Sequence, residues 1–385
     1  QDAQLEQGLV ATSVITTGAV PAQAGLLENT PRLDYSSGAT CPSLLLEPSR
    51  TNLIEYSEYL GSSEWLKRTS DSTPIPVVTD NYEISPEGKQ NASRVVVTKP
   101  SADNDYAVIN INNGVNKSAG DKFSASVYIK ATDASQIGKI VDIYSFESGG
   151  GYWPIASHTL TADWVRVYVV GTAYTSTGNV ELLNIGKARS SEGGTTLANM
   201  ATDFLLYGAQ LEAGAYATSY IPTYGTSQTR AGELCNSAGD AATFNDSEGV
   251  LYAEIAAIAD GEANRAIAIS DGTTSNVVRF YYSTTADRIV GNVKSAGTNV
   301  FNFNNVLTDS TNFIKIALSY KANDFKMYVN GVLVATGTSG NAPIGLNELS
   351  FDNGGNFDDF YGKAKQLLYF PTALSDADLA TLTTI

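Results

Sequence analysis

A fifteen-residue stretch near the start of the chain recurs later without a gap. Residues 3–17 read AQLEQGLVATSVITT and residues 209–223 read AQLEAGAYATSYIPT, so ten of the fifteen aligned positions are identical. With average residue usage, about one identical position among fifteen is expected by chance. A repeat of this kind indicates one structural unit used twice. Because the second copy ends a long β-rich stretch, we expect the first copy to be the terminal strand of a preceding module.

Alternating apolar and polar residues predict strands in the body of the chain. Phe123–Ile129 alternates throughout, and Trp164–Val170 does the same. In the second stretch the side chains divide into a core-facing set of Val165, Val167 and Val169 and an opposite set of Trp164, Arg166 and Tyr168.

One hairpin and one helix can be placed from local signals. Asn330-Gly331 favours a type I′ turn, which pairs Val329 with Val332 and Met327 with Val334. Near the end, Leu374–Leu382 is predicted to be a short helix with Ser375 as its N-cap.

Composition excludes several functional classes. The net charge of −16, from 24 basic and 40 acidic residues, disfavours nucleic acid and anionic membranes as partners. No apolar run approaches the ~20 residues that cross a bilayer, so no membrane insertion is expected. Two cysteines, Cys41 and Cys235, are interpreted as free thiols, and the single histidine, His158, as a polar surface residue.

The predicted fold class is all-β, with two tandem β-sandwiches after an extended N-terminal segment. Residues 1–50 form that segment, with the strand motif of a preceding module. Residues 51–225 and residues 226–385 each have the size and strand pattern of a jelly-roll or lectin-like sandwich. Turn-rich sequence around Pro222–Gln228 marks the boundary between them.

Several motifs resemble segments of bacteriophage fibre and other virion structural proteins. They are Leu44–Leu53, Tyr56–Glu58 with Trp65, Tyr207–Glu212 and Thr218–Thr223. The stretch between them looks like a carbohydrate-binding jelly-roll module. The C-terminal part looks like a laminin G / concanavalin A-like lectin domain, on Ile316–Tyr320, Met327–Gly331 and Gly362–Ser375.

The resemblance implies a non-enzymatic protein of a virion surface, in a head or tail fibre, that adheres to host or environmental glycans. It implies other virion proteins as partners and a homo-oligomer, with a trimer favoured. Three alternatives stay open. The chain could be a secreted or cell-surface bacterial adhesin or carbohydrate-binding module array, a glycan-cleaving enzyme on a lectin-like fold, or a purely architectural protein.

Sugar binding uses aromatic faces framed by polar side chains. Tyr144 and the glycine-rich stretch that holds Tyr152 and Trp153 supply the leading candidates. Tyr281-Tyr282 is a weaker one, because one ring of two neighbours on a strand must point outward.

No cofactor is predicted, but calcium stays open as a ligand. The two oxygen-rich loops are Asp352–Asp359, with Asp352, Asp358 and Asp359, and Asp103–Asp105, with Asp103 and Asp105. Such loops more often exist because Asn and Asp stabilise turns.

No catalytic residues are predicted. A glycoside hydrolase needs two carboxylates across a cleft, roughly 5–10 Å apart. The acidic pairs Asp246/Glu248 and Asp260/Glu262 stand beside glycines, which favours turns, and Asp358-Asp359 point to opposite faces of a strand.

Overall fold

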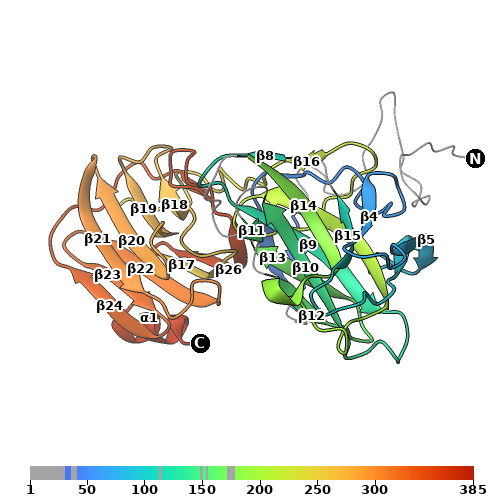
Figure 1. The fold of residues 1–385 in the computed structure, drawn as a ribbon. Coiled ribbons are helices and arrows are strands. Elements are labelled where there is room, and N and C mark those ends of the chain that lie inside the picture. Colours follow the sequence, from blue (N-terminus) through green and yellow to red (C-terminus); the bar gives the residue numbers. More distant parts are fainter. Residues whose placement is uncertain (1–30, 36–40, 112–114, 148–150, 153–154, 171–177) are drawn as a thin grey trace, which may run out of the picture. The chain divides into compact units, whose positions relative to one another are not determined.

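The computed structural model describes residues 31–35, 41–111, 115–147, 151–152, 155–170 and 178–385. Regular structure in these residues is almost entirely β-strand, with a short 3₁₀ turn at Ser190–Glu192 and the helix α1 (Asp376–Thr383). Figure 1 follows these elements along the chain. The first copy of the repeat lies outside the described residues. The all-β prediction is confirmed.

The chain divides into two compact units. We call Ser49–Ala231 the inserted unit, and Gly232–Ile385 together with the described part of Ala24–Pro48 the host unit. The inserted unit therefore interrupts the sequence of the host unit.

Two sheets form the inserted unit. One contains β4 (Trp65–Thr69), β7 (Ala107–Ile111), β14 (Gly178–Lys187), β10 (Ile140–Glu147) and β11 (Gly151–Tyr152), with β12 (Ala156–Thr159) on β10 and β8 (Val115–Lys117) on β14. The other runs β13 (Val165–Val170), β9 (Phe123–Ala131), β15 (Asp203–Ala213), β6 (Ala92–Val96) and β5 (Val77–Glu83). The apolar sides of both sheets share one core, which includes Ile109, Ile143, Val127 and Phe204. This is a β-sandwich.

The host unit is a second sandwich. Its larger sheet runs β1 (Leu33–Asp34), β2 (Ser43–Leu46), β26 (Gly362–Phe370), β17 (Glu248–Ala257), β22 (Ile314–Lys321), β23 (Phe325–Val329) and β24 (Val332–Gly337). The smaller runs β21 (Thr298–Val306), β20 (Arg288–Ser295), β19 (Val277–Tyr282), β18 (Arg265–Ser270) and β25 (Glu348–Ser350). Their shared core includes Leu251, Ile267, Phe280 and Leu318.

The domain boundaries differ from the prediction at the N-terminal side. Residues 1–50 were expected to belong to neither sandwich, but β2 pairs with β26 through Leu44–Leu46 and Gly362–Ala364. This pairing joins residues far apart in sequence, so no local sequence pattern predicts it. A two-stranded ladder of β3 (Arg50–Asn52) and β16 (Gln228–Arg230) closes the inserted unit where the chain enters and leaves it.

The polar residues of the second repeat copy form hydrogen bonds in the interior of the inserted unit. The fully buried Gln210 accepts from the Ile221 amide at 2.6 Å, and Glu212 accepts from the Thr218 amide at 2.9 Å. Asn52 accepts from the Leu211 amide at 3.1 Å and donates to the Ile221 carbonyl at 2.8 Å. The first copy has the same residue types at the positions that match Gln210, Glu212, Thr218 and Ile221.

Local predictions fared well in the host unit. Asn330 and Gly331 have φ of 49° and 82°, and Val329 pairs with Val332, which confirms the hairpin turn. The expected Met327–Val334 pair is wrong, because a β-bulge shifts Met327 to Ala335. Ser375 caps α1 as predicted and accepts from the Asp378 amide at 3.2 Å.

Within the described residues, no helix has the length and apolar character that crossing a membrane requires.

Candidate functional site

Of the three leading sugar candidates, Tyr144 and the backbone of Tyr152 lie on one sheet of the inserted unit, and only Tyr144 is described in full. Tyr144 is 4% exposed and packs with Val108 and Ala188, so its ring presents almost no face to solvent. Tyr152, in β11, pairs through its backbone with Phe146 of β10. The side chain of Tyr152 and all of Trp153 lie outside the described residues, so their sugar-binding role stays a prediction.

The first calcium candidate, the loop Asp352–Asp359, is stabilised by its own hydrogen bonds. The buried Asp352 carboxylate accepts from the Gly354 amide at 2.6 Å, and burial raises its pKa. Asp358 accepts from the Asn353 side chain at 3.1 Å, and Asp359 accepts from the Tyr361 hydroxyl at 3.1 Å. These carboxylates act as turn acceptors.

The second calcium candidate already surrounds a cation of the protein. The ammonium of Lys187, a fully buried residue, donates to the main-chain oxygens of Asp103 at 2.5 Å, Asp105 at 2.9 Å and Ala188 at 2.9 Å. An ammonium has three N–H donors, so all of them are used. Burial lowers the pKa of Lys187, and the nearby Asp142 opposes that shift. In the described parts of the chain, no three acidic, thiol or imidazole groups gather as a metal cluster.

In both acidic pairs considered for hydrolysis, the aspartate accepts hydrogen bonds from backbone amides that are distant in sequence. Asp246 accepts from the Gly345 and Leu346 amides at 2.7 and 2.9 Å, and Asp260 accepts from the Asp287 amide at 2.7 Å. His158 lies on β12, where burial lowers its pKa. Cys41 and Cys235 are exposed free thiols, as predicted.

Glu58, a buried carboxylate that the sequence places in a motif but not among the site candidates, joins two segments of the inserted unit. Glu58 is 2% exposed and accepts from the hydroxyls of Tyr220 and Tyr224, each at 3.1 Å, and from Tyr207 at 3.3 Å. Burial raises the pKa of Glu58, and the tyrosine hydrogen bonds oppose that shift. The three hydroxyls meet Oε1, and the Asn91 side chain donates to Oε2 at 3.0 Å, so Glu58 is an internal acceptor rather than a group that a substrate can reach.

The outer face of the smaller host-unit sheet carries aromatic, guanidinium and amide side chains, of which Asn302 is exposed, Arg279 and Tyr281 are half-buried and Asn292 is buried. Tyr282 is 2% exposed and faces the core, so its neighbour Tyr281 faces outward and is half-buried, as the alternation predicts. The Arg279 guanidinium lies over the Tyr281 ring, 5.6 Å from its centre. Such stacking holds both groups in place.

Asparagines of the neighbouring strands continue this face. Arg279 donates to the Asn292 side-chain oxygen at 3.1 Å and to the Asn353 carbonyl at 3.0 Å. Asn292 in turn donates to the Asn302 side-chain oxygen at 3.3 Å. The exposed Asn302 therefore keeps its amide donors free, because that contact uses only its oxygen.

We refer to Tyr281, Arg279, Asn292 and Asn302 as the Tyr281 face. It offers the half-buried ring of Tyr281 beside a guanidinium and the exposed amide of Asn302, while the buried Asn292 fixes their positions. A ligand with an apolar face and hydroxyl groups along its edge matches that arrangement. The sequence alternation identifies Arg279 and Tyr281 as neighbours, but the asparagines meet them only through strand register.

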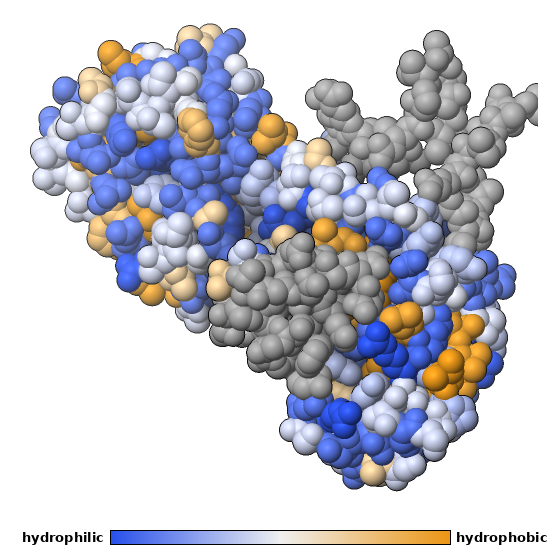
Figure 2. Space-filling model, turned by 45° about the horizontal axis from the view of Figure 1, so that its top comes forward, coloured by the Kyte–Doolittle hydropathy of each residue, from blue (hydrophilic) through white to orange (hydrophobic). Residues whose placement is uncertain are grey.

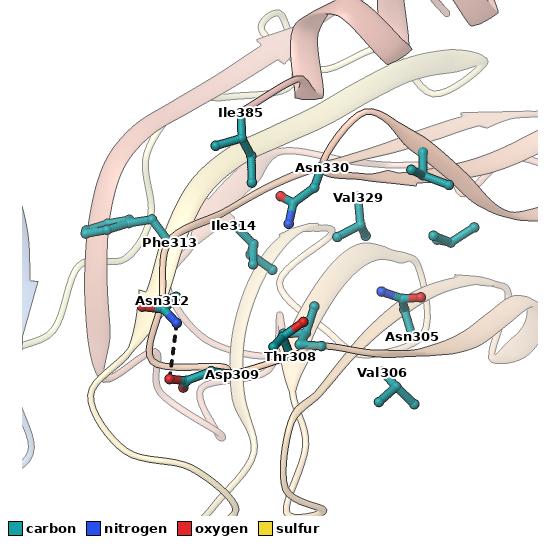
Figure 3. Close-up of a pocket in the computed structure, with 13 residues that line it drawn as sticks. Asn305, Val306, Thr308, Asp309, Asn312, Phe313, Ile314, Val329, Asn330 and Ile385 are labelled. Atoms are coloured by element: carbon teal, nitrogen blue, oxygen red, sulfur yellow. Dashed lines mark hydrogen bonds between the residues drawn. The ribbon is translucent and has the colours of Figure 1, made fainter.

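A separate pocket of about 390 Å³ lies within the host unit, between the end of β21 and the β23–β24 hairpin. Figure 3 shows Asn305 and Asn330 among aliphatic side chains that include Val306, Ile314 and Val329. The Phe313 ring points away from the other labelled side chains (Figure 3). The pocket suits a ligand group that is largely aliphatic and carries a hydrogen-bonding edge.

The inserted unit exposes apolar residues near its edge strand β5. Ile75, Val77 and Ile84 are 57%, 60% and 55% exposed. Figure 2 shows hydrophobic side chains gathered on one part of this unit, whereas the visible surface of the host unit is mostly hydrophilic. Exposed apolar edge strands are ready templates for association.

Comparisons with known proteins give similarity to solved structures alone. No protein-family model matches the chain. No curated protein matches it significantly.

Among solved structures, the CBM40 of Ruminococcus gnavus IT-sialidase bound to alpha2,3 sialyllactose is 15% identical, with 40% of this chain and 95% of that chain covered and a TM-score of 0.33. Domains LG4-5 of the mouse laminin alpha1 chain are 8% identical, with 69% and 89% covered and a TM-score of 0.25. Sheep galectin-11 in complex with glycerol is 10% identical, with 32% and 88% covered and a TM-score of 0.24. At these TM-scores none of these likenesses identifies a ligand for this chain.

Proposed function

We propose that this chain is a non-enzymatic structural protein of a bacteriophage virion surface, in a head or tail fibre, that adheres to glycans. The observation that carries the glycan-binding part is the Tyr281 face. Pyranose rings have an apolar face that stacks on aromatic rings and hydroxyl groups that bind side-chain amides such as that of Asn302. The motifs at Leu44–Leu53 and Tyr207–Glu212, which resemble virion proteins, support the phage assignment.

The test is binding to an array of neutral and acidic glycans. We expect Tyr281→Ala to weaken binding of a neutral glycan at least tenfold, because the stacking surface is lost. Asn302→Ala removes free amide donors and should weaken it less. Tyr35→Ala is the matched control, since Tyr35 is a 58% exposed tyrosine of the same unit outside this face.

Two outcomes would overturn the proposal. If Tyr281→Ala binds the glycan as tightly as the wild type and its circular dichroism is unchanged, the Tyr281 face is not the binding site. Release of reducing ends from a bound polysaccharide by the wild-type chain would favour a glycan-cleaving enzyme instead.

Assembly into a homo-oligomer completes the proposed role. The exposed apolar residues beside β5 support it, because burying them on association is favourable by roughly 25 cal/mol per Å². Analytical ultracentrifugation of the wild-type chain and of Val77→Lys tests this part. Identical sedimentation of the two would exclude this surface as the contact.

A further inference from the structure

The outer face of β13, an edge strand of the inserted unit, presents a clamped arginine. Arg166 lies between two tyrosines, 5.5 Å from the centre of the Tyr128 ring and 5.3 Å from that of Tyr168. Tyr128 lies directly opposite on β9, and Tyr168 is two residues further along β13. Tyr168 is 51% exposed, so its outer face is open to solvent.

The hydrogen-bonding capacity of Arg166 is mostly unused. Its Nη2 donates to the Ser126 hydroxyl at 2.8 Å, while its Nε is buried without a partner. In the part of the chain that the structure describes, Arg166 forms no salt bridge. A guanidinium carries five N–H donors in a planar fork that matches a carboxylate.

A second cation belongs to the same face. Lys130 is two residues from Tyr128 on β9, so it lies diagonally from Arg166 on the same side of the sheet. Among the described residues Lys130 has no acidic partner either. Asp203, on the same side, is already paired with Arg94 and accepts from Thr132 at 2.7 Å. Two unpaired cations thus share one face of a chain with net charge −16.

We propose that Arg166, Lys130 and Tyr168 bind an acidic saccharide, a sugar that carries a carboxylate. The carboxylate meets the free side of the Arg166 fork, with Lys130 adding charge, and the sugar ring stacks on Tyr168. The rings of Tyr128 and Tyr168 hold the guanidinium in position, which lowers the entropy lost on binding. This inference rests on the proposed glycan-binding function but uses the other unit and a different chemical class of ligand.

The experiment compares each acidic glycan with its neutral form. Polygalacturonate is measured against its fully methyl-esterified form, and hyaluronan oligosaccharides and sialyllactose against their carboxyl-reduced forms, by isothermal titration with the full chain. At least one acidic form should bind tenfold or more tightly than its neutral form. Equal binding of both forms, or no binding of any acidic glycan, would overturn the proposal.

Variants locate the carboxylate contact. Arg166→Gln should weaken acidic binding at least tenfold, and Arg166→Lys should recover only part of it, because lysine keeps the charge without the fork. Arg189→Gln is the matched control. Arg189 also stacks on a tyrosine, 5.1 Å from the centre of the Tyr106 ring, but lies near Glu192 at 3.8 Å.

The control separates site from net charge. If Arg189→Gln weakens binding as much as Arg166→Gln, general charge explains the effect and the proposal is wrong. Tyr281→Ala separates this site from the proposed function. It should remove neutral binding while acidic binding at Arg166 persists, so either part can fail alone.

Discussion

Arg166 in the inserted unit and Arg279 in the host unit share one local pattern, an arginine followed two residues later by a tyrosine on the same strand. Both guanidinium groups stack on that tyrosine, at 5.3 and 5.6 Å, and both donate to a side chain of the neighbouring strand. The surroundings differ. Arg279 lies on an interior strand and also donates to the Asn353 carbonyl, whereas Arg166 lies on an edge strand.

The difference shows how one motif can serve two purposes. Where a loop uses the donors of the arginine, as Asp352–Asp359 does for Arg279, the guanidinium mainly stabilises structure and positions Tyr281. Where no loop reaches it, the donors stay available to a ligand. Lys187 is the extreme case, because all three of its N–H donors are used inside the protein.

Replacement of Lys187 should have the largest effect. Lys187→Met removes the donor to the carbonyls of Asp105 and Ala188 and leaves the buried Asp142 carboxylate without its nearby cation, and we expect the free energy of unfolding of the inserted unit to fall by about 3–5 kcal/mol. Lys130→Met, at an unpaired lysine of the same unit, should change it by less than ~0.5 kcal/mol. Chemical denaturation with hydrogen exchange on β7 and β14 measures both. Equal effects would show that the buried ammonium contributes nothing special.

The second largest effect is expected at the two arginines, whose replacement should lower the stability by different amounts. Arg279→Ala leaves Asn353 and Asn292 without their donor, and we expect a loss of about 1–3 kcal/mol in the free energy of unfolding. Arg166→Ala should cost less than ~1 kcal/mol, because its donors mostly face outward. Urea titration of both variants decides the matter. A larger loss for Arg166→Ala would reverse the comparison.

Replacement of Gly354 tests how rigid the loop Asp352–Asp359 beside Arg279 is. Gly354 has φ of 85°, and an added Cβ would lie 2.9 Å from the Ser270 Cβ. Gly354→Ala should therefore cost about 1–2 kcal/mol, the typical cost of the left-handed conformation, plus a contact penalty. Gly297→Ala is the matched control, because Gly297 has φ of 79° and nothing within 4 Å of an added Cβ. Equal melting temperatures for the two variants would mean that the loop can shift to accommodate the added Cβ without a further loss of stability.

The smallest expected effect is one of pH. Burial raises the pKa of Asp352 above its ordinary value of 3.8, so the folded state retains the proton longer than the unfolded state. The free energy of unfolding should therefore decrease as the pH rises from 3.8 through the raised pKa. Asp352→Asn keeps an acceptor for the Gly354 amide but lacks this contribution. Parallel stability profiles for wild type and variant would contradict the shift.

What the sequence could predict depended on how local the cause was. The turn at Asn330-Gly331, the cap at Ser375 and the outward side of β13 follow from adjacent residues, and all three are as expected. The bulge at Met327, the pairing of β2 with β26 and the asparagines opposite Arg279 depend on register between distant strands. Tyr144 illustrates a further limit, because alternation along a strand cannot tell an open outer face from a covered one.

The pairing of β2 with β26 also has a consequence for how the molecule is made. Leu44–Leu46 emerge from the ribosome long before their partners Gly362–Ala364, with the whole inserted unit synthesised in between. The inserted unit can complete its own sandwich while the chain is still growing, since domains fold as units during synthesis. The larger host sheet cannot be completed until β26 has been synthesised. Until then, the edge of β2 that pairs with β26 has no partner strand.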